Sequence, residues 1–356
     1  MAAGIHAASG KVQIISLPMS DGGTGCLDAI LHACGGKRIS VRVHDPLMRP
    51  ITAEIGIPAS NGCAVIEMAS ASGLTLLEPE ERDPTRTTSY GTGELIKAAM
   101  DHHVSKIIVG IGGSATTDGG IGAAQALGCR FLDENGDPLP LGMTGGDLHK
   151  VHGFDLTGRD ERISGIELIV AWDVDNPFTG PRGAARIYSP QKGATPAQVE
   201  ELEQGLCSLE LLVKKHLGLD LFDVPGAGAA GGMGGGMTAF LGAKMKKGID
   251  VVMETVGFRE KLKEADLVFT GEGSLDSQTL HGKTISGIVR EAKKAGVPVV
   301  ALAGQLGKDM ESLYKQGLTA AISINPEGMP LETAMKEALK NLRTTTENLV
   351  RLILSD

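Results

Sequence analysis

The chain has 356 residues, of which 42% are hydrophobic and 22% charged, which are ordinary values for a folded protein long enough for two domains. The formal net charge of −9 argues against nucleic acid or an anionic membrane as the main partner. No apolar run approaches the ~20 residues of a membrane helix, and the first residues lack the features of a signal peptide. Five cysteines without a C-x-x-C pair argue against structural zinc or a disulfide framework, so we expect a cytoplasmic protein.

Short apolar runs alternate with helix-like stretches along the chain. The strand-like runs are 12–17, 65–68, 106–111, 167–171, 266–270, 297–302 and 320–324. The helix-like stretches are 93–101, 119–127, 196–216, 287–295 and 331–355. This alternation predicts an α/β protein with parallel sheets and crossover helices. Because ligands bind beyond the carboxyl ends of such strands, the residues that follow each strand are the candidate binding residues.

A glycine-rich turn follows the run 106–111. It contains Gly112, Gly113 and Ser114 and leads into a helix start, where exposed N–H groups favour anions. The spacing matches neither the dinucleotide fingerprint nor the Walker A loop. A tight turn that needs small residues for packing is the alternative, and Asp118 is expected to cap the helix.

A second glycine-rich segment spans 225–236, with almost no side chains. One interpretation is a phosphate cradle that includes Gly228 and Gly231. The other is a helix packed closely against another backbone, because glycine is otherwise costly in a helix.

The stretch after 266–270 combines glycines with charges. Gly271 and Gly273 flank Glu272, Asp276 follows, and Lys283 precedes the next expected helix. A carboxylate that holds a metal and a cation that neutralises phosphate are parts that phosphoryl transfer requires. Charged residues among glycines are poor candidates for structural burial, so we favour a functional interpretation.

Two further loops carry candidate groups. Asp173 and Asp175 close the run 167–171 and could share Mg²⁺, or one could act as a base, although an Asx turn before Pro177 would account for Asn176. The hydroxyl-rich loop 82–93 holds two arginines suited to carboxylate or phosphate, with an exposed, solvated loop as the alternative. Cys63 and Cys129 lie in apolar contexts and are expected to fill core space.

Seven segments, in order along nearly the whole chain, resemble the bacterial type I glycerate kinase family. They read L-P-M-S-D-G-G (17–23), R-D-P-T-R-T-T-S-Y-G-T-G-E-L-I (82–96), I-G-G-S-A-T-T-D-G-G (111–120), D-V-D-N-P-F (173–178), P-Q-K-G-A (190–194), V-P-G-A-G-A-A-G-G-M-G (224–234) and G-E-G-S-L-D-S-Q-T-L-H-G-K-T (271–284). Any one of these motifs alone would be a weak signal, whereas seven collinear motifs are specific.

The resemblance implies ATP-dependent phosphorylation of glycerate, with Mg²⁺ as a cofactor and 2-phosphoglycerate as the favoured product, in a monomer or homodimer. It also implies a Rossmann-related domain (1–44 and 248–356), a flavodoxin-like domain inserted into it (45–247), and an active site between the two.

The resemblance also implies roles for individual residues at the matching positions. Asp21, Asp173 and Asp276 become ligands of the metal or the substrate hydroxyl, and Lys192, Lys283 and Arg82 become clamps for phosphate or carboxylate. We assign catalysis to Asp21, Asp173, Asp276 and Lys283, and metal binding to Asp173, Glu272 and Asp276. The expected substrate- or phosphate-binding residues are Arg82, Thr88, Gly112, Gly113, Ser114, Lys192, Gly228, Gly231, Gly271 and Gly273.

The sequence departs from the family pattern in two places. Family members usually open with a strand and a loop resembling P-D-S-F-K-G-S, and this sequence is expected to begin inside the helix that follows that loop. The usual G-G-E-G-T reads Gly22-Gly23-Thr24-Gly25-Cys26, without the acid. The alternative function is therefore an impaired homologue that binds nucleotide or a small hydroxy acid without turnover. A nicotinamide-dependent dehydrogenase would also use glycine-rich loops on parallel strands, but the dinucleotide spacing is lacking.

Overall fold

The computed structural model describes residues 1–59, 62–276, 284–307 and 310–355, and it divides into two compact units. The larger unit is Met19–Val252, and the smaller unit combines Met1–Pro18 with Met253–Asp356. The sequence placed the divisions at 44/45 and 247/248. The first division lies earlier because α2 (Cys26–Cys34) packs on the sheet of the larger unit and β1 (Gly36–His44) pairs with β2 (Pro50–Pro58).

The larger unit is built on a six-stranded sheet in the order β1-β2-β3-β4-β7-β8. Its further strands are β3 (Cys63–Glu67), β4 (Lys106–Gly110), β7 (Glu167–Trp172) and β8 (Lys244–Lys247). Neighbours among β1, β2 and β3 are antiparallel, while β3, β4, β7 and β8 are parallel. Because the parallel strands bring their carboxyl ends to one edge, the loops that follow β3, β4 and β7 meet there.

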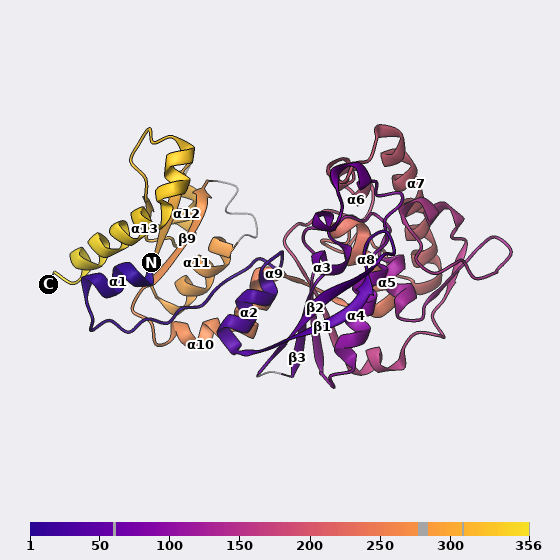
Figure 1. The fold of residues 1–356 in the computed structure, drawn as a ribbon, viewed down its shortest axis with the longest axis horizontal. Coiled ribbons are helices and arrows are strands. Elements are labelled where there is room, and N and C mark those ends of the chain that lie inside the picture. The colour runs from indigo at the N-terminus through magenta and orange to yellow at the C-terminus, as the bar shows by residue number, and fades with distance from the viewer. Residues whose placement is uncertain (60–61, 277–283, 308–309, 356) are drawn as a thin grey trace. The chain divides into compact units, whose positions relative to one another are not determined.

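Helices accompany this sheet in the larger unit (Figure 1). They are α2, α3 (Ala69–Ser72), α4 (Tyr90–Met100), α5 (Ile121–Ala126), α6 (Ala184–Tyr188), α7 (Pro196–Leu217), α8 (Ala229–Leu241) and α9 (Gly248–Thr255), which crosses the unit boundary. Short 3₁₀ turns lie at Leu74–Leu76, Pro79–Glu81, Gly145–Lys150, Glu161–Gly165 and Pro190–Lys192, and a small antiparallel pair joins β5 (Arg130–Leu132) to β6 (Gly153–Asp155). The core is aliphatic along β3, where Ala64, Val65 and Ile66 are fully buried, and Cys63 and Cys129 fill core space as expected.

The smaller unit contains a parallel sheet in the order β11-β10-β9. Its strands are β9 (Val268–Leu275), β10 (Val299–Leu306) and β11 (Ala320–Ser323), and its helices are α1 (Ala2–Ala8), α10 (Phe258–Leu262), α11 (Thr284–Ala295), α12 (Glu311–Gln316) and α13 (Leu331–Ile353). α1 lies alongside α13 (Figure 1), where Gly4 sits against the carbonyl of Arg343 and the Arg351 guanidinium donates to the carbonyl of Ala7.

The prediction of a mixed α/β protein is confirmed, but the strand expected at 12–17 is wrong. Those residues form irregular backbone, and none of the described residues pairs with them in a ladder, which a strand requires. Within the described ranges, no helix is both long and apolar enough to span a membrane.

Candidate functional site

The loop after β4 lies at the carboxyl edge of the large sheet and is held in place by backbone contacts. The carbonyl of Gly113 accepts from the N–H of Leu74, and the N–H of Ala115 donates to Ser72. Gly113 has φ +72° and is exposed, while Ser114 is only 8% exposed. The loop therefore offers a fixed backbone with a hydroxyl close to the surface.

A second loop, 20–24, lies across the same edge. A Cβ on Gly112 would sit 2.8 Å from the Cα of Gly23, so glycine permits this close approach. Asp21 accepts from the N–H of Gly23 at 3.1 Å, which shapes the turn. Burial, followed by the nearby carboxylates of Glu67 and Asp21, raises the pKa of Cys26 to about 12. The structure thus places Asp21 beside the start of α2, whose Leu27 N–H donates to Glu67 at 3.0 Å.

Lys192 reaches the loop after β4 from the 3₁₀ turn Pro190–Lys192. Its ammonium group donates to Ser114 Oγ at 2.9 Å and to the carbonyl of Thr116 at 2.6 Å. The side chain is 2% exposed, and burial lowers the pKa of Lys192 to about 7, although the Asp118 carboxylate opposes this shift. The structure therefore brings together Lys192 and Ser114, two residues predicted for anion binding from segments far apart in the sequence.

Two polar groups near Lys192 lack a partner. Within the described residues, Arg82 Nε and Thr116 Oγ1 are buried without a hydrogen bond. The backbone and Cβ of Arg82 lie against Gly193, the residue after Lys192. The sequence indicated Arg82 as a binding residue, and it offered the Thr116 hydroxyl for phosphate or helix capping without assigning Thr116 to the site.

The buried Asp118 carboxylate connects the end of this loop to Ser89, the residue before α4. Its carboxylate accepts from the N–H and hydroxyl of Ser89, at 2.8 and 2.7 Å, and from the N–H groups of Gly120 and Gly122. Burial raises the pKa of Asp118, although these hydrogen bonds oppose that shift. The N-cap of α5 is Gly120 rather than Asp118, but Asp118 accepts from N–H groups at the start of that helix and also binds Ser89.

Thr88 is fully buried beside this connection. Its hydroxyl accepts from the N–H of Tyr90 at 3.2 Å, at the start of α4. This contact gives Thr88 a structural role, and its predicted role in binding substrate or phosphate stays a prediction.

The loop after β7 carries the acidic pair. Asp173 and Asp175 are exposed, and Asp175 pairs with Arg182 at 3.2 Å. Burial, followed by the charges of Asp173 and Asp175, raises the pKa of Tyr188 to about 12. Asn176 accepts from the Tyr188 hydroxyl at 2.5 Å and donates to the carbonyl of Arg182, so it joins α6 to this loop rather than only turning the chain.

The glycines of 225–236 pack against backbone. Gly228 lies against the carbonyl of Pro177, and a Cβ on Gly231 would sit 2.7 Å from the Cα of Thr117. Ala230, Gly231 and Gly232 all have positive φ and interrupt α8. Close packing accounts for this segment, and phosphate binding by Gly228 and Gly231 stays a prediction.

In the smaller unit, the described residues predicted to bind phosphate or metal lie on β9 or directly after it. Gly271 lies against the carbonyl of Leu302, while Gly273 is exposed with open space beside it. Glu272 and Asp276 are half-buried. Lys283 and the rest of 277–283 lie outside the described residues.

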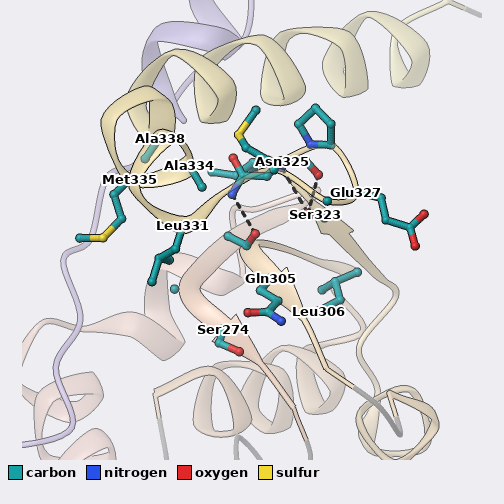
Figure 2. A pocket seen from close by; sticks show the side chains of 16 residues that line it. Ser274, Gln305, Leu306, Ser323, Asn325, Glu327, Leu331, Ala334, Met335 and Ala338 are labelled. Carbon is teal, nitrogen blue, oxygen red and sulfur yellow. Dashed lines mark hydrogen bonds between the residues drawn. The ribbon is translucent and has the colours of Figure 1, made fainter.

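A cavity of about 1080 Å³ lies beyond the carboxyl ends of β9, β10 and β11, at the start of α13. Figure 2 shows Ser274 and Gln305 beside it, with Leu331 and Met335 on the α13 side. Asn325 donates to the carbonyl of Gly304 at 2.9 Å and shapes the floor. This edge is where open parallel sheets bind ligands, and Gly273 lines it.

Within the described part of the chain, no three His, Cys, Asp or Glu side chains converge in a metal-binding arrangement. The three carboxylates assigned to a metal come from both units: Asp173 from the larger, Glu272 and Asp276 from the smaller.

The whole chain is similar to known kinases. The model of the glycerate kinase family matches residues 1–354. A glycerate kinase from Halalkalibacterium halodurans is 46% identical over 94% of this chain and 87% of its own length, and a glycerate 2-kinase from Escherichia coli is 43% identical over 95% and 88%. A solved structure from Salmonella typhimurium LT2 that carries the name glycerate kinase 2 matches with a TM-score of 0.88 and 41% identity, over 99% of this chain and 92% of that one. This chain belongs to the glycerate kinase family.

Proposed function

We propose that the chain transfers a phosphoryl group from ATP to glycerate, giving ADP and phosphoglycerate, with 2-phosphoglycerate as the favoured product. The observation that carries the proposal is the buried ammonium of Lys192 held against Ser114 at the carboxyl edge of the large sheet. The names and high identity of the relatives support the substrate.

The residues present fit an anionic substrate. Phosphoryl transfer depends on positioning and on groups that neutralise negative charge. Lys192 brings a cation to the loop after β4, and Arg82, whose backbone lies against Gly193, has a buried Nε without a partner among the described groups. We infer that this loop, including Gly112 and Gly113, receives an anionic group of a substrate.

The carboxylates fit a magnesium ion that arrives with the nucleotide. Mg²⁺ is usually held by carboxylates together with substrate phosphates, so the protein ligands need not converge before the nucleotide binds. Asp173, Glu272 and Asp276 are the proposed ligands, and the bound ion would neutralise charge on the phosphates. The negative charges of Asp173 and Asp175, which together with burial raise the pKa of Tyr188, would favour a bound cation near Asp173.

Further assignments complete the proposal. Asp21 and Asp276 orient the acceptor hydroxyl or the metal, and Lys283 contacts phosphate. The smaller unit corresponds to the Rossmann-related domain and the larger unit to the inserted flavodoxin-like domain. A cytoplasmic location is consistent with five free cysteines.

The test is ADP formation from Mg-ATP and D-glycerate, with the phosphate position read by NMR. We expect turnover by the wild type and a fall of about 100-fold or more in kcat for Asp173→Asn or Asp276→Asn, because a lost metal or hydroxyl ligand acts on the chemical step. Lys215→Met, an exposed position on α7, is the control and should keep the wild-type rate. Binding of Mg-ATP without ADP release in the wild type would contradict the proposal.

A further inference from the structure

The ammonium group of Lys192 is enclosed and incompletely bonded. A lysine ammonium has three N–H donors, and two of them reach Ser114 Oγ and the Thr116 carbonyl. Both acceptors are neutral. Among the described residues, no carboxylate forms an ion pair with Lys192, and the Asp118 carboxylate acts on it only through space.

A buried cation without a counter-ion is costly, so the free protein favours the neutral amine as pH rises. Burial accordingly lowers the pKa of Lys192 to about 7. An anion that bound close by would supply the missing charge and favour the protonated form. Anion binding and proton uptake by Lys192 are therefore linked.

Ser114 is the group through which Lys192 can act. A protonated Lys192 can only donate, so Ser114 Oγ accepts and the hydroxyl hydrogen of Ser114 is left for another acceptor. Ser114 keeps 8% of its surface exposed and follows the exposed Gly113, whereas Lys192 keeps only 2%. The Ser114 hydroxyl is therefore the part of the hydrogen-bonded Lys192–Ser114 pair that a ligand can reach.

We propose that Ser114 donates a hydrogen bond to an anionic oxygen of a substrate, and that Lys192 is its positioning residue and takes up a proton as the anion binds. The proposal deepens the kinase function and rests on it for the choice of anions. The shared chemistry is an anionic oxygen, supplied by the carboxylate of glycerate or by a phosphate of the nucleotide.

Unpartnered groups around the pair point to the same ligand. Thr116, whose carbonyl accepts from Lys192, is fully buried and its hydroxyl has no partner among the described groups. Arg82, packed against Gly193, likewise has a buried Nε without one. The charge that acts on Lys192 through space is that of Asp118, from the loop before α5, while the backbone of Arg82 lies against the neighbouring Gly193.

Proton uptake is measured by titration calorimetry at pH 8.5, where Lys192 is mainly neutral in the free protein and the nucleotide phosphates are already ionised. Each ligand is titrated in two buffers with different ionisation enthalpies, and the difference in binding enthalpy gives the protons taken up. One arm uses glycerate, and the other uses Mg²⁺ with a non-hydrolysable ATP analogue. The arm that shows uptake identifies the source of the anionic oxygen.

In the wild type we expect uptake approaching one proton in one arm, and affinity for that ligand that weakens as pH rises above about 7. Lys192→Met should abolish uptake, flatten the pH dependence and weaken that ligand about tenfold or more, the cost of losing a charged hydrogen-bonding group. Ser114→Ala should weaken the same ligand, and Ser114→Thr should restore it. Lys215→Met should behave as the wild type.

Wild-type binding without proton uptake in either arm would overturn the proposal, as would unchanged uptake in Lys192→Met. If Lys192→Met fails to fold, the Ser114 pair decides: equal affinities for alanine and threonine variants would refute the hydroxyl contact. These outcomes are separate from the kinase assay, because failure of the proposed function is the absence of ADP formation in the wild type.

Discussion

Two buried titratable groups, Lys192 and Asp118, lie at the loop after β4. Lys192 and Asp118 are both titratable and both removed from water, yet neither pairs directly with the other. Asp118 is stabilised by four hydrogen-bond donors, whereas Lys192 has two neutral acceptors. Burial therefore raises the pKa of Asp118 and lowers the pKa of Lys192, because it disfavours the charged form of each.

The depressed pKa of Lys192 predicts a pH-dependent stability. Between pH 7 and 10.5 the unfolded chain binds a proton at this lysine that the folded chain does not, so the free energy of unfolding rises with pH. Relative to Lys192→Met, the wild type should gain up to about 1.4 kcal/mol per pH unit across this window. Urea unfolding at pH 7, 8.5 and 10 measures the difference. A constant difference would show that Lys192 stays charged throughout.

Sequence reasoning reached Lys192, Arg82 and Ser114 because their motifs belong to a set of seven that is specific when taken together. It could not foresee that Thr116 would be buried without a partner or that Asp118 would bind Ser89. Those facts depend on how segments distant in sequence fold against one another, and residue type alone does not encode that arrangement.

At the scale of elements, α8 shows where local propensity and packing disagree. Its glycine-rich sequence is a poor helix former, yet it forms a helix, interrupted at Ala230, because the absent side chains let its backbone approach the loop after β4. The expected strands at 65–68, 106–111 and 167–171 correspond to β3, β4 and β7, since continuous apolar runs are typical of buried parallel strands. β1 and β2 were missed because their partly exposed, mixed sequences lack that signal.

Gly231→Ala and Gly242→Ala separate packing from backbone strain in α8. Both glycines have φ near +70°, but a Cβ at Gly231 would overlap the Thr116 carbonyl, whereas Gly242 has open space. We expect Gly242→Ala to cost about 1–2 kcal/mol from φ alone, and Gly231→Ala about 3–5 kcal/mol. Denaturant unfolding measures both. Similar losses would mean that the backbone relaxes around the new methyl group.

At the scale of the whole molecule, the chain forms two units with separate sheets and separate stabilising groups. In the smaller unit Glu291 is 5% exposed and accepts from Arg259, Arg290 and Lys294, at 2.7, 3.0 and 2.9 Å. Burial raises the pKa of Glu291, but these hydrogen bonds outweigh it and lower the pKa to about 2. The pair with Arg259 joins α11 to α10, while Arg290 and Lys294 lie on α11 itself.

Calorimetry of Glu291→Gln tests whether the units unfold separately. We expect two transitions, with only that of the smaller unit falling by roughly 3–10 °C in the variant. The wild-type advantage should be complete above pH 4.5 and lost as pH falls toward 2, because only the unfolded carboxylate is protonated in that window. Gly231→Ala, in the larger unit, should move the other transition. One transition that both variants shift together would show a single cooperative unit.

The division of the chain between the units has a consequence for its synthesis on the ribosome. α1 is made before its packing partner α13, which spans Leu331–Ile353. At typical elongation rates, roughly 15–60 s separate the two, during which the larger unit can be completed first. Ile5, which is buried in the folded protein, has no access to its final site through that interval. The packing of α1 on α13 therefore forms only after α13 has been synthesised.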